Sequence, residues 1–95
     1  MNLAAAGAHL HEATIKCIVY HDWGDILIEL EGGANTSEDC DNKSFVVLDE
    51  SSKFFDKMHA AALSAFHANS SIKGWVSGCA GRFKSPKLIR MDLVK

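Results

Sequence analysis

Short runs of alternating apolar and polar residues dominate this chain, and one longer run with helical spacing interrupts them. Alternation with a period of two places apolar side chains on one face of a β-strand, whereas spacings of three and four place them on one face of a helix. The sequence therefore predicts three strands, one helix and two further strands. The predicted strands are 13–21, 26–31, 44–48, 72–79 and 88–94, and the predicted helix lies between residues 49 and 69.

A small closed barrel accounts for this order of elements. Five strands with one helix inserted after the third are the arrangement of an OB-type β-barrel. Residues 22–25 form a predicted hairpin turn, and residues 32–42 lack periodicity and are expected to form an exposed loop. The sequence thus predicts a mainly β, single OB-like domain over residues 13–95, preceded by a flexible N-terminal arm over residues 1–12.

The predicted helix carries two kinds of surface. Residues 49–52 supply negative charge and hydrogen-bond acceptors at its start, and Asn69 suits its end. Leu63 falls outside the apolar arc, so we expect this side of the helix, with His59 and His67, to contact another subunit. Seven side chains share the arc that is expected to face the core: Phe54, Phe55, Met58, Ala61, Ala62, Ala65 and Phe66.

Length and charge exclude several classes of protein. A chain of 95 residues holds one domain, and no apolar stretch approaches the roughly 18 residues that cross a bilayer, so we expect no membrane span. Ten basic and twelve acidic residues give a formal net charge of −2, without the basic surplus that supplies affinity for nucleic acid. A modest local patch would comprise Lys16, Lys73, Lys84, Lys87 and Arg90.

Three cysteines permit one disulfide and leave one thiol over. Cys17 lies on the same strand face as Ile15 and Val19 and is expected to be a buried apolar residue. Cys40 and Cys79 lie at polar strand edges, where a bridge would pin the acidic loop to the sheet. Such a bridge implies an oxidising compartment, either secreted or periplasmic, whereas unpaired thiols would fit the cytoplasm.

The first residues leave two explanations open. Ala4–Ala6 resemble the small-residue end of a signal peptide, but the charged start and the apolar segment that should precede it are missing. The chain is then either a mature exported protein with a short remnant or a cytosolic protein with a frayed end. The cysteines favour the exported protein.

No catalytic, metal or cofactor motif stands out. The five histidines include no HExxH pair, and residues 39–42 lack the glycine and distal glutamate of a calcium loop. No Gly-x-Ser-x-Gly turn marks a nucleophile. We therefore expect no enzyme, no bound metal and no cofactor.

Aromatic residues outside the core faces are the candidate ligand contacts, because flat rings stack on sugars or bases. Tyr20 and Trp23 lie at the first hairpin, and Trp75 lies in the fourth strand, where it could also pack beneath the helix or against a neighbouring subunit. They predict a non-enzymatic, oligomeric binding module for a carbohydrate or protein ligand. The alternatives are a single-stranded nucleic-acid-binding OB domain and a protein–protein adaptor.

Several segments read together resemble the OB-fold B-subunit-like proteins, which comprise the binding subunits of subtilase-type bacterial toxins and small exported relatives. The resemblance covers residues 13–94 and implies a Cys40–Cys79 bridge, a ring-shaped oligomer such as a pentamer, and glycan recognition. Cys17 is an extra thiol relative to this pattern. The segments are ATIKCIVY, DILIEL, SFVVLD with a cysteine before it, KMHAAALSAFHAN, IKGWVSGC and LIRMDLV.

Overall fold

Five strands and one helix form from the predicted segments and follow one another in the predicted order. The computed structural model describes residues 7–95. Its elements are β1 (Ala8–Tyr20), β2 (Ile26–Leu30), β3 (Phe45–Leu48), α1 (Phe55–Ala68), β4 (Ser71–Ala80) and β5 (Ser85–Val94).

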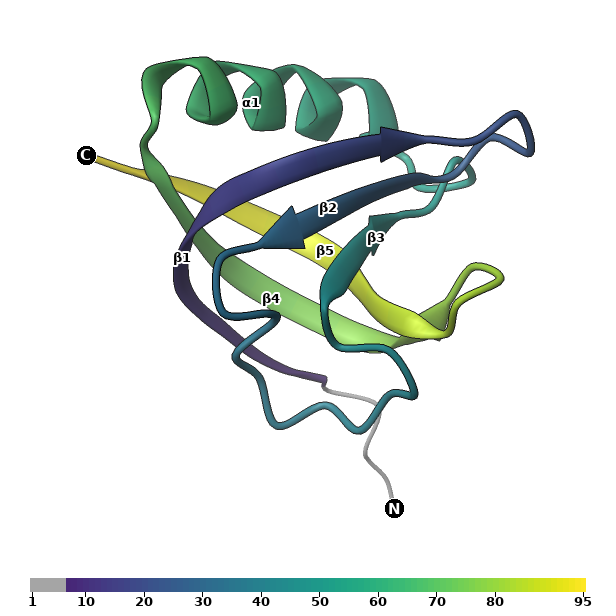
Figure 1. Ribbon diagram of the computed structural model, residues 1–95. Coiled ribbons are helices and arrows are strands. Elements are labelled where there is room, and N and C mark those ends of the chain that lie inside the picture. Colours follow the sequence, from purple (N-terminus) through teal and green to yellow (C-terminus); the bar gives the residue numbers. More distant parts are fainter. Residues whose placement is uncertain (1–6) are drawn as a thin grey trace.

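The strands close into a barrel in the order β1–β2–β3–β5–β4, which confirms the predicted OB-type architecture. Neighbouring strands run antiparallel except at the closing contact, where β3 and β5 pair in parallel at Val47 and Lys87. β1 is long and strongly bent, and it pairs with β4 through its first half and with β2 through its second half (Figure 1). Sharing β1 in this way lets five strands enclose one core.

α1 lies across one end of the barrel and contacts β1, β3, β4 and β5 (Figure 1). Ala62 and Ala65 are its buried residues, and their small side chains let the helix approach the strands closely. Phe55 and Met58 pack against the same core from its rim. All five strands contribute apolar side chains to the interior: Ala8, Leu10, Ile15, Ile26, Ile28, Leu30, Val46, Leu48, Ile72, Val76 and Leu88.

The first strand begins at Ala8 rather than at residue 13, so the predicted flexible arm is wrong for residues 8–12. Ala8 pairs with Val76 of β4, and Leu10 is only 1% exposed. Because the partner strand lies near the other end of the chain, the local pattern gave no sign of this pairing. Residues 1–6 of the predicted arm lie outside the described residues.

A β-bulge in β1 changes which residues face inward. The pairing with β2 shifts between Ile15 and Cys17, and after the shift Ile18 rather than Val19 packs against the core. Cys17 and Val19 are therefore half-buried on the outer side of the barrel. The prediction that Cys17 lies in the core is wrong, and its thiol is free.

The helix begins later than predicted. Asp49 starts a turn in which its carboxylate accepts a hydrogen bond from the Ser51 N–H (3.1 Å), and the helix N-cap is Phe54. Phe54 and Phe66 are 49% and 39% exposed, so their predicted place in the core is wrong. Asn69 ends the helix in the left-handed conformation, with a φ of 56°, as predicted.

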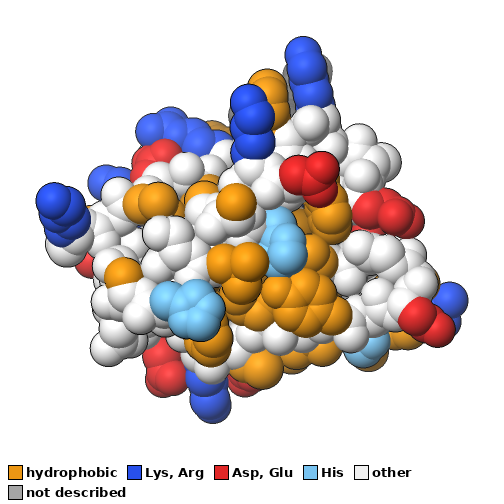
Figure 2. Space-filling view, turned by 90° about the horizontal axis from the view of Figure 1, so that it is seen from above, with side chains coloured by type: hydrophobic (Ala, Val, Ile, Leu, Met, Phe, Trp, Pro, Cys, Tyr) orange, Lys and Arg blue, Asp and Glu red, His pale blue; other side chains and the backbone are white. Residues whose placement is uncertain are grey.

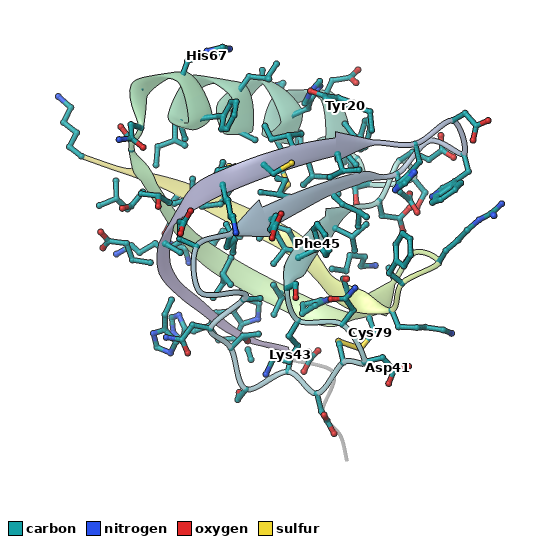
Figure 3. The ribbon with its side chains drawn as sticks, viewed as in Figure 1. Tyr20, Asp41, Lys43, Phe45, His67 and Cys79 are labelled. Atoms are coloured by element: carbon teal, nitrogen blue, oxygen red, sulfur yellow. A yellow bond between two sulfur atoms is a disulfide. The ribbon has the colours of Figure 1, made fainter. Side chains whose placement is uncertain are left out.

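A disulfide joins Cys40 to Cys79, which is the predicted pairing. It ties the β2–β3 loop to β4 (Figure 3). The neighbouring Gly78 N–H donates a hydrogen bond to the Glu38 carboxylate of the same loop. Ala34 of this loop is buried, so the loop is held against the barrel and is less exposed than its composition predicted. Disulfides persist in oxidising compartments.

Candidate functional site

The outer side of β1, β2 and β3, which we call the outer face, carries side chains in rows set by the strand register. One row comprises Cys17, Glu29 and Phe45, and the next, nearer the β1–β2 loop, comprises Val19, Leu27 and Val47. Leu27 and Val47 are 4% and 0% exposed although they lie outside the cluster of side chains that fills the barrel. Their burial shows that other segments cover this end of the outer face.

The β1–β2 and β4–β5 loops place three aromatic rings and one guanidinium group at this covered end. We call these four residues, His21, Trp23, Arg82 and Phe83, the loop cluster. The His21 and Trp23 rings stack with centroids 4.0 Å apart and an interplanar angle of 9°. The Arg82 guanidinium carbon lies 4.2 Å from the Trp23 ring centroid, a cation–π contact. The Phe83 ring centroid lies 5.8 Å from that of His21 and 6.3 Å from that of Trp23. Residues far apart in the sequence thus form one group.

Close contacts hold these loops in place. Gly24 has a φ of 106°, and a side chain there would collide with the Glu50 carboxylate. The Asp25 carboxylate accepts a hydrogen bond from the Glu50 N–H (3.2 Å). Gly81 lies over Val47, since a Cβ at this position would be 3.5 Å from the Val47 side chain. The β1–β2 and β4–β5 loops therefore project from the same side of the barrel (Figure 1).

An open cleft of about 400 Å³ lies at the opposite end of the outer face. Lys16 of β1 and Glu29 of β2 form an ion pair of 3.9 Å in its wall. Lys43, near the end of the β2–β3 loop, also lines the cleft. The strand between Lys16 and His21 spans about 17 Å. The outer face is therefore longer than a single sugar ring.

The charges around the loop cluster are mixed. Asp22, Asp25 and Glu50 lie on or beside the β1–β2 loop, whereas Arg82 and Lys84 lie on the β4–β5 loop. Carboxylates repel phosphate groups but accept hydrogen bonds from hydroxyl groups, to which a guanidinium also donates. These surroundings suit a neutral, hydroxylated ligand better than a polyanion.

The three aromatic residues selected from the sequence lie in three places. Trp23 belongs to the loop cluster and is half-buried. Tyr20 is 54% exposed and lies beside α1, where its hydroxyl is hydrogen-bonded to His59 Nε2 at 2.6 Å (Figure 3). Trp75 lies on the outer side of β4 against the His9 ring, with centroids 4.4 Å apart, rather than beneath the helix. Of the three, Trp23 is the one that joins the outer face.

Of the α1 residues expected at a subunit contact, His59 contacts Tyr20. His59 and Leu63 are half-buried, so Leu63 is less exposed than predicted, while His67 is exposed and points away from the barrel (Figure 3). Seen from above α1, hydrophobic side chains gather around a histidine (Figure 2). Contact with another subunit through this surface stays a prediction.

The five basic residues named from the sequence do not form one patch. Lys16 lies on the outer face, and Lys84 and Lys87 lie where β5 begins. Lys73 and Arg90 instead lie on the outer side of β4 and β5, on the other half of the barrel. A continuous basic track for a phosphate backbone is therefore not formed by these residues.

Sequence reasoning missed four residues of the site: His21, Phe45, Arg82 and Phe83. For the three loop residues, His21, Arg82 and Phe83, the signal is topological, because the first and last hairpin loops of an OB-type barrel flank the same face. A ring in each of these two loops was visible in the sequence. Only the closed topology makes them neighbours.

Comparison with protein-family models, with curated proteins and with solved structures finds no match for this chain. Within residues 7–95, no three His, Cys, Asp or Glu side chains lie close enough to hold a metal ion. In the same range, no helix has the length and apolar character needed to span a membrane. Fold and site together define the class: an OB-type barrel with a loop-flanked aromatic face.

Proposed function

We propose that this chain is a non-enzymatic module that binds a carbohydrate on the outer face. The observation that carries the proposal is the loop cluster, in which two distant loops hold three rings and a guanidinium together. Sugar rings have apolar faces that stack on aromatic side chains, and their hydroxyl edges bond to carboxylate and guanidinium groups. Both kinds of partner surround the cluster.

Each part of the outer face has a role in this proposal. Phe83, which is 43% exposed, is the accessible ring. Trp23 is fixed by His21 and Arg82 and supports the ring system beneath the ligand. The cleft at Lys16 and Glu29 would hold a sugar unit further along the chain. The proposed ligand is therefore an oligosaccharide rather than a monosaccharide. An exported location would suit both this ligand and the disulfide.

A single-stranded nucleic acid is the second candidate for the same face. Arg82 belongs to the loop cluster, Lys84 lies in the same loop and Lys87 lies near the start of β5, and bases stack on aromatic rings. The three carboxylates beside the β1–β2 loop argue against it, since they repel phosphates. The experiment below therefore includes an oligonucleotide.

On an array of immobilised oligosaccharides, we expect the labelled protein to bind a limited set of glycans. Phe83→Ala and Trp23→Ala should each weaken that binding about tenfold, because each removes a stacking surface. Phe54→Ala is the matched control: this ring is 49% exposed, and the ammonium groups near it, those of Lys53 and Lys57, do not belong to the loop cluster. Its binding should equal that of the unmodified protein.

Three results would reject the proposal. One is that the loop-cluster variants bind the same glycans as tightly as the Phe54→Ala control. The second is tight, salt-dependent binding of a single-stranded oligonucleotide without any glycan binding, which would favour the second candidate. The third is binding to neither probe, which would leave the adaptor hypothesis as the better account.

A further inference from the structure

A second group of charged and aromatic side chains lies on the outer side of the other half of the barrel, where β1, β4 and β5 run side by side. The strand register aligns His9 of β1 with Trp75 of β4, and Trp75 with Arg90 of β5. In the adjacent row, Lys73 is opposite Asp92. A small cavity of about 120 Å³ is lined by His9, Lys73, Gly74, Arg90 and Asp92. We call it the β4–β5 cavity.

The charged side chains that line the β4–β5 cavity are two cations, Lys73 and Arg90, and one carboxylate, Asp92. The Arg90 guanidinium donates from Nε and Nη2 to the two carboxylate oxygens of Asp92, at 3.0 and 3.1 Å. This pairing occupies the carboxylate and fixes the guanidinium, and it leaves further N–H groups of Arg90 unused. Among the described residues, Lys73 has no carboxylate within the 4.0 Å of an ion pair. Its ammonium is therefore available to a ligand.

The donors reach the cavity from three strands. His9, Lys73 and Arg90 come from β1, β4 and β5 in turn, and the edge-on contact with Trp75 orients the His9 ring. A planar carboxylate is satisfied by one guanidinium, as Asp92 already is. A tetrahedral oxyanion accepts hydrogen bonds from several directions and so makes better use of donors that converge from separate strands.

We propose that the β4–β5 cavity binds a phosphate or sulfate group, with Lys73 and Arg90 as its main ligands and His9 as a further donor. The cavity lies on the opposite half of the barrel from the outer face and is independent of carbohydrate binding there. The recognised chemistry is the tetrahedral anion itself, whether free or carried by a larger molecule. The small volume of the β4–β5 cavity suits one phosphate or sulfate group rather than a whole sugar ring.

Titration with inorganic phosphate, followed by two-dimensional NMR of the amide and indole N–H groups, tests the proposal. Sodium chloride should keep the ionic strength constant, because exposed charges are screened by salt. We expect saturable shifts at Lys73, Arg90 and the Trp75 indole. Lys73→Ala and Arg90→Lys should each weaken binding about tenfold. Lys57→Ala, on exposed α1 surface, is the matched control and should bind as before.

Titrations with further anions distinguish a free anion from one carried by a larger molecule, and they include the results that would reject the proposal. Sulfate and a sugar phosphate should shift the same signals, and tighter binding of the sugar phosphate would identify a carried rather than a free anion. Acetate should bind at least several-fold more weakly. Shifts that do not saturate, that persist unchanged in Lys73→Ala, or that acetate reproduces at equal concentration would overturn the proposal. The spectra of the variants also report whether each remains folded.

Discussion

Reduction of the Cys40–Cys79 disulfide is expected to lower the free energy of unfolding by about 4 kcal/mol. The two cysteines are separated by 39 residues in the sequence, and the chain-entropy relation assigns a stabilisation of this size to such a loop. Small domains have about 5–15 kcal/mol of total stability. Reduction should therefore bring this domain close to unfolding, as measured by guanidinium denaturation with and without a reductant.

Two variants make this measurement specific to the disulfide. The double variant Cys40→Ser/Cys79→Ser should match the reduced protein without any reductant. Cys17→Ser should leave the unfolding midpoint of the oxidised protein nearly unchanged, because this thiol is free and lies on the outer side of β1. If oxidised and reduced proteins unfold at the same denaturant concentration, the disulfide does not stabilise the fold as described.

Leu88→Ala is expected to cost about 2–5 kcal/mol of unfolding free energy, the usual range for a fully buried leucine. Leu88 is 0% exposed and follows Lys87, where β5 makes the parallel contact with β3 that closes the barrel. Its truncation would leave a cavity inside the closed core. Urea denaturation of the oxidised protein measures the difference.

The next residue of the strand provides the control for this truncation. Ile89 is 44% exposed, so Ile89→Ala should cost less than about 1 kcal/mol. This contrast between neighbouring residues depends on the way in which β5 faces the core. Equal losses for the two variants would contradict a closed barrel with Leu88 inside it.

The alternation of apolar and polar residues was sufficient to predict the architecture, because few other folds bury the apolar faces of five such strands and one helix. The bulge in β1 was not predictable from that pattern. It inserts one residue after Ile15 and turns Cys17 and Val19 outward. The bulge depends on the bend that lets β1 pair with both β4 and β2. The extension of β1 to Ala8 also depends on pairing with β4, which is not local.

The candidate site was only partly predictable. Trp23 was identified because a ring in a hairpin turn has no obvious place in the core. Its partners Arg82 and Phe83 come from the last hairpin, and they become its neighbours only through closure of the barrel. The exposure of Phe54 has a different cause: the helix starts after a turn, so Phe54 precedes the part of α1 that packs on the core.

Nuclear Overhauser spectroscopy of the protein in solution tests most directly whether closure of the barrel joins the two loops into one site. We predict cross-peaks between Val47 and Lys87 and between the Trp23 and Phe83 rings, with the Arg82 side-chain protons shifted upfield by the Trp23 ring. Absence of both sets of cross-peaks, with Arg82 at the chemical shifts of an unstructured chain, would contradict the account.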